Sequence, residues 1–163
     1  MNKVLSIETA IKTSVKIRSE GKKIVLVGGC FDILHPAHVL FLQKAKKLGD
    51  ALFVLLESDK TIQMQKGQNR PIHSQKDRAM VIASISVVDY VVLLPPFKND
   101  TDYDNLLLKL KPTIIATTSG DPNRHHKERQ GKLISATVIN VMKRVKTAST
   151  SNVAKLLVTD YSL

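Results

Sequence analysis

"KIVLVGGCFDILHPAH", residues 23–38, is the stretch that decides the fold. It begins with a run of β-branched and other apolar residues that ends in Gly28 and Gly29, which is typical of a buried strand. Pro36 then stands where the first turn of a helix begins, and apolar residues follow at helical spacing as far as Gly49. The stretch therefore predicts a strand, a polar loop and a helix.

The same alternation of strand and helix continues along the chain. The patterns predict strands at 51–57, 90–94, 113–118 and 136–142, and helices at 6–19, 73–85, 101–111 and 150–158. Two polar and basic segments, residues 60–70 and 121–132, are expected to be mobile loops. Apolar strands that alternate with helices indicate a parallel sheet covered on both faces. The expected fold class is α/β, a doubly wound, Rossmann-like parallel sheet.

The length and composition indicate one domain. We expect residues 1–163 to form it, with a lead-in helix within residues 1–21 and an α/β core over 23–160. No apolar run reaches the ~18 residues of a membrane helix, and charges interrupt the N-terminal segment, so it is no secretory signal. The single cysteine, Cys30, excludes an intramolecular disulfide. These features favour a cytoplasmic protein that does not enter a membrane.

The net charge of +11 favours anionic partners. Nucleic acids, nucleotides and phosphorylated metabolites all fit that charge. Only 4% of the residues are aromatic and there is no Trp, which makes a stacking platform for single strands hard to build. The basic residues are also scattered along the chain, so nucleic acid is the least favoured of these partners.

The loop after the first strand has the features of a phosphate cradle. Gly28 and Gly29 let the backbone approach a ligand closely, and the helix that follows offers free N–H groups and the positive end of its dipole. His35 and His38 are three residues apart and share one face of that helix. The loop has neither the Lys of a P-loop nor a third glycine, so neither of those nucleotide signatures is present.

Two other interpretations of the same residues remain open. Asp32, His35 and His38 have the types and spacing of a metal site, although a second pair of ligands is missing. Alternatively, Asp32 caps the helix and the two histidines are ordinary surface residues.

Four segments resemble the motifs of one family. "GGCFDILHPAH", residues 28–38, is similar to the G-x-F-D-x-x-H-x-G-H signature of the cytidylyltransferase-like nucleotidyltransferases. "RPIHSQKDRAMVI" at 70–82, "SGD" at 119–121 and "RVKTASTSN" at 144–152 resemble further motifs of that family in the same order. The resemblance implies an HUP-type nucleotidyltransferase fold.

Within that family, the chain most resembles the D-glycero-β-D-manno-heptose 1-phosphate adenylyltransferase domain. Glycerol-3-phosphate cytidylyltransferase and archaeal FAD synthetase are related enzymes. The resemblance implies transfer of a nucleoside monophosphate from ATP or CTP to a small phosphorylated acceptor, such as a sugar phosphate, with release of pyrophosphate. It also implies Mg²⁺ carried in with the triphosphate, and a homodimer.

The resemblance assigns roles residue by residue. The implied catalytic residues are His35, His38, Lys66 and Arg144. The implied nucleotide-binding residues are Gly28, Gly29, Cys30, Phe31, Asp32, His35, His38, Asp121, Arg144, Ser149, Thr150 and Ser151. The implied acceptor-binding residues are Lys66, Arg70 and Arg78. No side chain is expected to bind a metal directly.

The chain departs from the family pattern in three places. Ala37 replaces the glycine between the two histidines, Ser151 replaces a threonine, and the Lys-Gly-Gly-Asp-Tyr pattern is missing around residues 116–127. These changes leave the base and the acceptor open. A sensor or scaffold that binds a nucleotide without turnover is therefore an alternative function. For Ser149 to Ser151, an ordinary helix N-cap is the alternative role.

Overall fold

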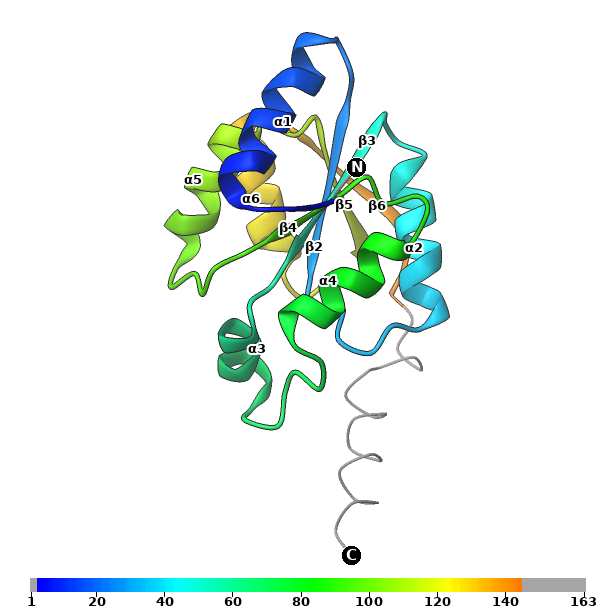
Figure 1. The fold of residues 1–163 in the computed structure, drawn as a ribbon. Coiled ribbons are helices and arrows are strands. Elements are labelled where there is room, and N and C mark those ends of the chain that lie inside the picture. Colours follow the sequence, from blue (N-terminus) through cyan, green and yellow to red (C-terminus); the bar gives the residue numbers. More distant parts are fainter. Residues whose placement is uncertain (1–2, 145–163) are drawn as a thin grey trace, which may run out of the picture.

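A six-stranded parallel sheet forms the centre of the computed structural model, which describes residues 3–144 (Figure 1). Its strands are β1 (Val4–Leu5), β2 (Ile24–Gly29), β3 (Ala51–Leu56), β4 (Tyr90–Leu93), β5 (Ile114–Ser119) and β6 (Thr137–Lys143). They lie in the order β1-β4-β3-β2-β5-β6, and every neighbouring pair is parallel. The expected doubly wound sheet is confirmed.

Helices cover both faces of this sheet. They are α1 (Ile7–Ser19), α2 (Pro36–Lys46), α3 (Asp59–Lys66), α4 (Gln75–Ser84), α5 (Asp100–Leu110) and α6 (Arg124–Ile134). The helices α2 and α4 pack on one face, whereas α1, α5 and α6 pack on the other (Figure 1). Among residues 3–144, no helix combines the length and the apolar character needed to cross a bilayer.

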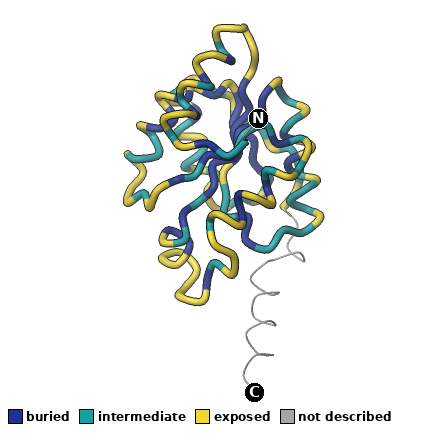
Figure 2. The backbone as a smooth tube through the Cα atoms, viewed as in Figure 1, coloured by how far each residue is buried: buried dark blue, intermediate teal, exposed yellow. Residues whose placement is uncertain are grey.

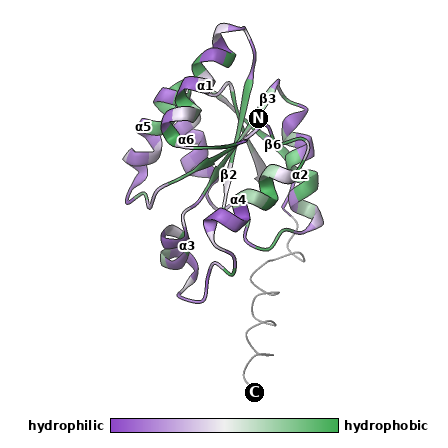
Figure 3. Cartoon of the chain, in the orientation of Figure 1, coloured by the Kyte–Doolittle hydropathy of each residue, from purple (hydrophilic) through white to green (hydrophobic). Residues whose placement is uncertain are grey.

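Two hydrophobic layers explain why the strands are apolar throughout. On β2, Val25 and Val27 face the layer beneath α2 and α4, whereas Ile24 and Leu26 face the layer beneath α1 and α5. Burying one such side chain contributes about 1.5–3 kcal/mol. The buried and hydrophobic segments accordingly coincide along the central strands (Figures 2 and 3). These two layers hold the carboxyl ends of the strands at one edge of the sheet.

The lead-in helix is confirmed as α1. Ser6 caps it, because its side chain accepts a hydrogen bond from the Thr9 N–H at 3.3 Å. After the helix ends, Gly21 takes a φ of +71°, a conformation that glycine adopts without strain. The chain can therefore turn back sharply into β2.

Three elements were not predicted from the sequence, and two of them lie in the expected loops. Helix α3 occupies most of residues 60–70, although only Thr61 and Ile62 of it are buried. Helix α6 occupies most of residues 121–132, and Gly131 is its only buried residue. Neither helix has an apolar stripe that periodicity could detect. The strand β1, with two residues, is too short to give any pattern.

Helix α6 is fixed instead by polar contacts with its neighbour α5. Arg129 makes two hydrogen bonds to Asp104 of α5, at 2.6 and 2.9 Å. His126 contacts Asp100 at 3.0 Å. The helix expected over residues 150–158 lies outside the described residues.

Candidate functional site

The strands β2 and β5 end side by side at the point where the strand order reverses. From β2, the chain continues to β3 on one side, while β5 and β6 lie on the other. Ligands of open α/β sheets bind at such a point, beyond the carboxyl ends of the strands. The motif segments 28–38 and 119–121 both lie there, so the structure brings together two of the four motif segments.

His35 and His38 form a stacked pair at the start of α2. Their ring centroids are 3.8 Å apart and the ring planes differ by 25°. The backbone N–H of His38 donates a hydrogen bond to the carbonyl of His35 at 2.9 Å, and the ring of Phe31 lies 5.3 Å from that of His38. The expectation that the two histidines point to one place is met.

The surroundings of the stacked pair favour the neutral form of both rings. Burial lowers the pKa of His35. Burial, and then the nearby charges of His35 and Lys66, lower the pKa of His38 to about 4. The Nδ1 atoms of both rings are buried and have no hydrogen-bond partner within the described part of the chain. An anion placed here would supply the counter-charge that the protonated rings lack.

Asp32 lies behind the cradle, not in it. Its carboxylate accepts a hydrogen bond from Arg70 Nε at 2.7 Å and further ones from the N–H groups of Ile72 and His73. Burial raises the pKa of Asp32, but these hydrogen bonds outweigh it and the pKa lies below its usual value. Asp32 is therefore neither a metal ligand beside the histidines nor a cap of α2.

Arg78, which was expected to bind the acceptor, is also buried. Only 1% of its side chain is exposed. Its guanidinium donates to the carbonyls of His73, Cys30 and Glu57, and to the carboxylate of Asp59 at 2.7 Å. These bonds join the ends of β2 and β3 to α4 and leave no open surface for a phosphate. Arg70 is buried in the same way, with its charge directed to Asp32.

Lys66 is the basic residue whose charge acts on the cradle. It is the last residue of α3 and is exposed. Burial raises the pKa of the Cys30 thiol. The charge of Lys66 and a hydrogen bond from it partly offset this increase. The charge of Lys66 also lowers the pKa of His38, so Lys66 acts on both Cys30 and the histidine pair.

The two glycines differ in what surrounds them. A side chain at Gly29 would lie 3.1 Å from the ring of Phe31, so that ring accounts for the glycine. Gly28 is exposed, and a side chain there would meet nothing nearer than Leu55, at 4.0 Å. Its bare backbone faces a cavity.

Asp121, expected at the nucleoside, follows β5. Its carboxylate contacts Lys127 Nζ at 2.5 Å and the Thr117 hydroxyl at 2.6 Å. Burial by itself would raise the pKa of Asp121. The hydrogen bonds from these partners and the charge of Lys127 together have the larger effect, so the pKa lies below its usual value. Arg144 donates its backbone N–H to Ser119 at the end of β5. Ser149, Thr150 and Ser151 lie outside the described residues.

A cavity of about 270 Å³ opens beside Gly28 and Cys30. Besides Gly28 and Cys30 it is lined by polar residues that belong to none of the expected site residues: Glu57, Gln65, Asp100, Tyr103, Asn123, His126, Lys127 and Gln130. Glu57 directly follows the apolar run of β3, and that position was the signal that would have found it. The lining residues between 123 and 130 were not expected at a site, because residues 121–132 were expected to form a loop.

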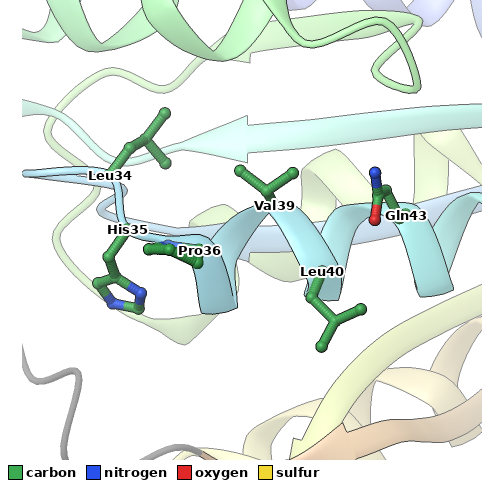
Figure 4. Close-up of a pocket in the computed structure, with 6 residues that line it drawn as sticks. All are labelled: Leu34, His35, Pro36, Val39, Leu40 and Gln43. Atoms are coloured by element: carbon green, nitrogen blue, oxygen red, sulfur yellow. The ribbon is translucent and has the colours of Figure 1, made fainter.

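A second hollow, of about 470 Å³, lies along one side of α2 (Figure 4). Its lining consists of Leu34, His35, Pro36, Val39, Leu40 and Gln43. Apolar side chains dominate it, and His35 is its single ionisable group. The polar chemistry of the site is therefore concentrated at the edge of the sheet.

Comparison with known proteins agrees with this geometry. Residues 26–155 match the family described as cytidylyltransferase-like. The bifunctional protein HldE of Wolinella succinogenes is 45% identical over 113 residues, which cover 69% of this chain and 23% of that protein. The HldE protein of Aliarcobacter butzleri is 38% identical over 152 residues, or 93% of this chain and 30% of that protein. The chain thus spans less than a third of these relatives.

Solved structures show the same fold. A lipopolysaccharide core biosynthesis protein from Thermoplasma volcanium superposes with a TM-score of 0.60 at 30% identity, over 77% of this chain and 98% of that one. Pantoate-beta-alanine ligase from Francisella tularensis superposes with a TM-score of 0.63 at 14% identity, over 100% of this chain and 82% of that one, and shows the fold alone. With most of its length matched, the chain belongs to the cytidylyltransferase-like family.

Proposed function

We propose that this protein transfers a nucleoside monophosphate from ATP or CTP to a small phosphorylated acceptor, such as a sugar phosphate, and releases pyrophosphate. The observation that carries the proposal is the stacked pair of histidines with buried Nδ1 atoms that have no hydrogen-bond partner within residues 3–144, at the start of α2. A helix N-terminus with two adjacent imidazoles suits a polyanion. The family membership supports the same activity.

Nucleotidyl transfer depends on positioning and on charge stabilisation. An oxygen of the acceptor phosphate attacks the α-phosphorus, and the bond to the β-phosphate oxygen breaks. His35 and His38 would hold phosphate oxygens as negative charge develops on the leaving pyrophosphate. Lys66 and Arg144 would add positive charge. Arg78 and the Asp32–Arg70 pair would keep the surrounding loops in place.

Mg²⁺ would enter with the nucleotide. Residues 3–144 contain no group of three or more His, Cys, Asp or Glu placed to hold a metal ion. Imidazole pairs and backbone N–H groups suit phosphate oxygens, and Mg²⁺ commonly binds through phosphates and water. When bound, it would neutralise charge on the triphosphate. Ser149, Thr150 and Ser151 remain predicted nucleotide contacts, and the homodimer remains a prediction.

Pyrophosphate release tests the proposal. Wild type is incubated with each of the four NTPs and heptose 1-phosphate, glycerol 3-phosphate or FMN. We expect release with ATP or CTP, and its loss in His35→Ala and His38→Ala. His73→Ala is the matched control, because its side chain is exposed and only its backbone contacts Asp32 and Arg78. Tight nucleotide binding without release from any acceptor would contradict the proposal and indicate a sensor or scaffold.

A further inference from the structure

The cavity beside Gly28 has two chemically different walls. Its apolar wall consists of Leu26, Leu55, Leu94, Leu107 and Ile115. Its polar wall comes from Glu57 after β3 and from side chains of α3, α5 and α6. At about 270 Å³ the cavity is slightly smaller than pockets for drug-sized ligands, which are about 300–1,000 Å³. It therefore suits one small ring or a short chain with an apolar side and a polar side.

Most charges on the polar wall are already paired. Lys127 contacts Asp121 at 2.5 Å. Asp100 contacts His126 at 3.0 Å and Arg129 at 3.4 Å. These groups fix α6 against α5 and against the end of β5, so they hold the shape of the cavity.

Glu57 differs from these groups. Both of its carboxylate oxygens accept from the hydroxyl of Tyr103, at 3.0 and 3.1 Å, and it makes no ion pair with any residue of the described range. Arg78 bonds the backbone carbonyl of Glu57 instead of its carboxylate. Burial raises the pKa of Glu57. A partly buried carboxylate with one neutral donor retains lone pairs that can accept further hydrogen bonds.

Charge decides which part of an acceptor lies here. The acceptor phosphate would be repelled by Glu57 and attracted by Lys66, which acts on both Cys30 and His38. Cys30 lines the cavity, so the cavity adjoins the cradle. Hydroxyl groups on the remainder of the acceptor are neutral donors that a carboxylate can bind.

We propose that this cavity takes the hydroxyl-bearing part of the acceptor, and that Glu57 sets acceptor specificity by accepting hydrogen bonds from those hydroxyls. Tyr103 is a positioning residue, because its hydroxyl orients the Glu57 carboxylate. Its ring is itself held against Phe97, with centroids 4.8 Å apart. This proposal rests on the proposed nucleotidyltransferase function and adds the recognition of the acceptor to it.

The test compares Michaelis constants for the acceptor and for the nucleotide. The probes are heptose 1-phosphate and mannose 1-phosphate as hydroxylated acceptors, and n-propyl phosphate as a competitor without hydroxyls. For Glu57→Leu we expect the acceptor KM to rise roughly 10- to 100-fold, as for loss of a hydrogen bond to a charged group. The nucleotide KM and the inhibition constant of n-propyl phosphate should stay unchanged.

Milder variants keep the result interpretable if Glu57→Leu folds poorly. Glu57→Gln retains one carbonyl acceptor and should fall between wild type and Glu57→Leu. Tyr103→Phe keeps the ring against Phe97 and should raise only the acceptor KM. Glu8→Gln, which changes an exposed carboxylate on α1, is the control and should match wild type.

The outcomes separate the two proposals. If wild type turns over and the acceptor KM does not change in these variants, the role of Glu57 is overturned while the activity stands. If Glu57→Gln loses as much as Glu57→Leu and glucosamine 1-phosphate becomes the best substrate of wild type, Glu57 recognises an ammonium group and hydroxyl recognition is overturned. If wild type releases no pyrophosphate with any nucleotide and acceptor, both proposals fail.

Discussion

Arg70 donates a hydrogen bond from Nε to the carboxylate of Asp32 over 2.7 Å, and both side chains are almost completely buried. The pair joins the loop after β2 to the segment that precedes α4. An acidic residue of the loop that resembles a nucleotide-binding signature thus supports the cradle from behind. Because both side chains are buried, the pair shapes the site and does not contact a ligand.

Replacing Arg70 by Met should destabilise the protein, because the Asp32 carboxylate stays buried without its cation. We expect a loss of about 3 kcal/mol in the free energy of unfolding, measured by urea denaturation at pH 7. The exposed pair Glu8–Lys12 provides the comparison, and Glu8→Gln should leave the free energy of unfolding close to that of wild type. Equal stability of the two variants would show that the buried pair is not structural.

Arg78→Lys should lower stability more than it affects acceptor binding. A lysine cannot reproduce the fork of bonds to the Cys30, His73 and Glu57 carbonyls, so we expect a loss of about 2–3 kcal/mol. Urea denaturation and the acceptor KM should be measured on the same variant. A large rise in the acceptor KM with unchanged stability would instead show that Arg78 binds the acceptor.

Stability should fall between pH 6.5 and about pH 4 through His38. Burial and the neighbouring charges lower its pKa from 6.5 to about 4, so the unfolded chain takes up a proton at a higher pH than the folded protein. This contribution is complete above pH 6.5 and is lost as the pH falls to about 4. His38→Asn should flatten this part of the profile of unfolding free energy against pH. An unchanged slope would mean that His38 titrates normally in the folded protein.

Ala37→Gly restores the glycine that the family pattern has between the two histidines. Ala37 lies in the first turn of α2, so the change should cost up to about 1 kcal/mol of stability. Removing the methyl group beside the cradle should also lower the Kd for the preferred nucleotide, measured by calorimetry. Weaker or unchanged binding would show that Ala37 already fits the nucleotide of this protein.

The sequence predicts those strands and helices that have a regular pattern of hydrophobic residues. Strand β2, helix α2 and the layers on both faces follow from apolar runs and from spacing. The sequence does not reveal α6, because Arg129 and His126 hold it through partners on α5 that only the fold brings near. Helix α3 has the same lack of a pattern.

Some features of the site were likewise predictable from the sequence and others were not. The adjacency of His35 and His38 follows from helical spacing, so it was predictable. The burial of Arg78 was not predictable, because the sequence does not show whether the side chain of an arginine is buried or exposed. Glu57 was detectable in principle, since it directly follows an apolar strand, but its partner Tyr103 lies 46 positions away along the chain.

The most direct measurement of the central claim is pyrophosphate release by wild type, His35→Ala and His38→Ala with ATP or CTP and a hydroxylated sugar phosphate. We expect release by wild type and a loss of about 10² to 10³-fold in kcat in each variant, as for removal of one charge-stabilising donor. Variants that release pyrophosphate as fast as wild type would contradict the assignment of the histidine pair. A wild type that releases none, with any of the four NTPs, would contradict the function itself.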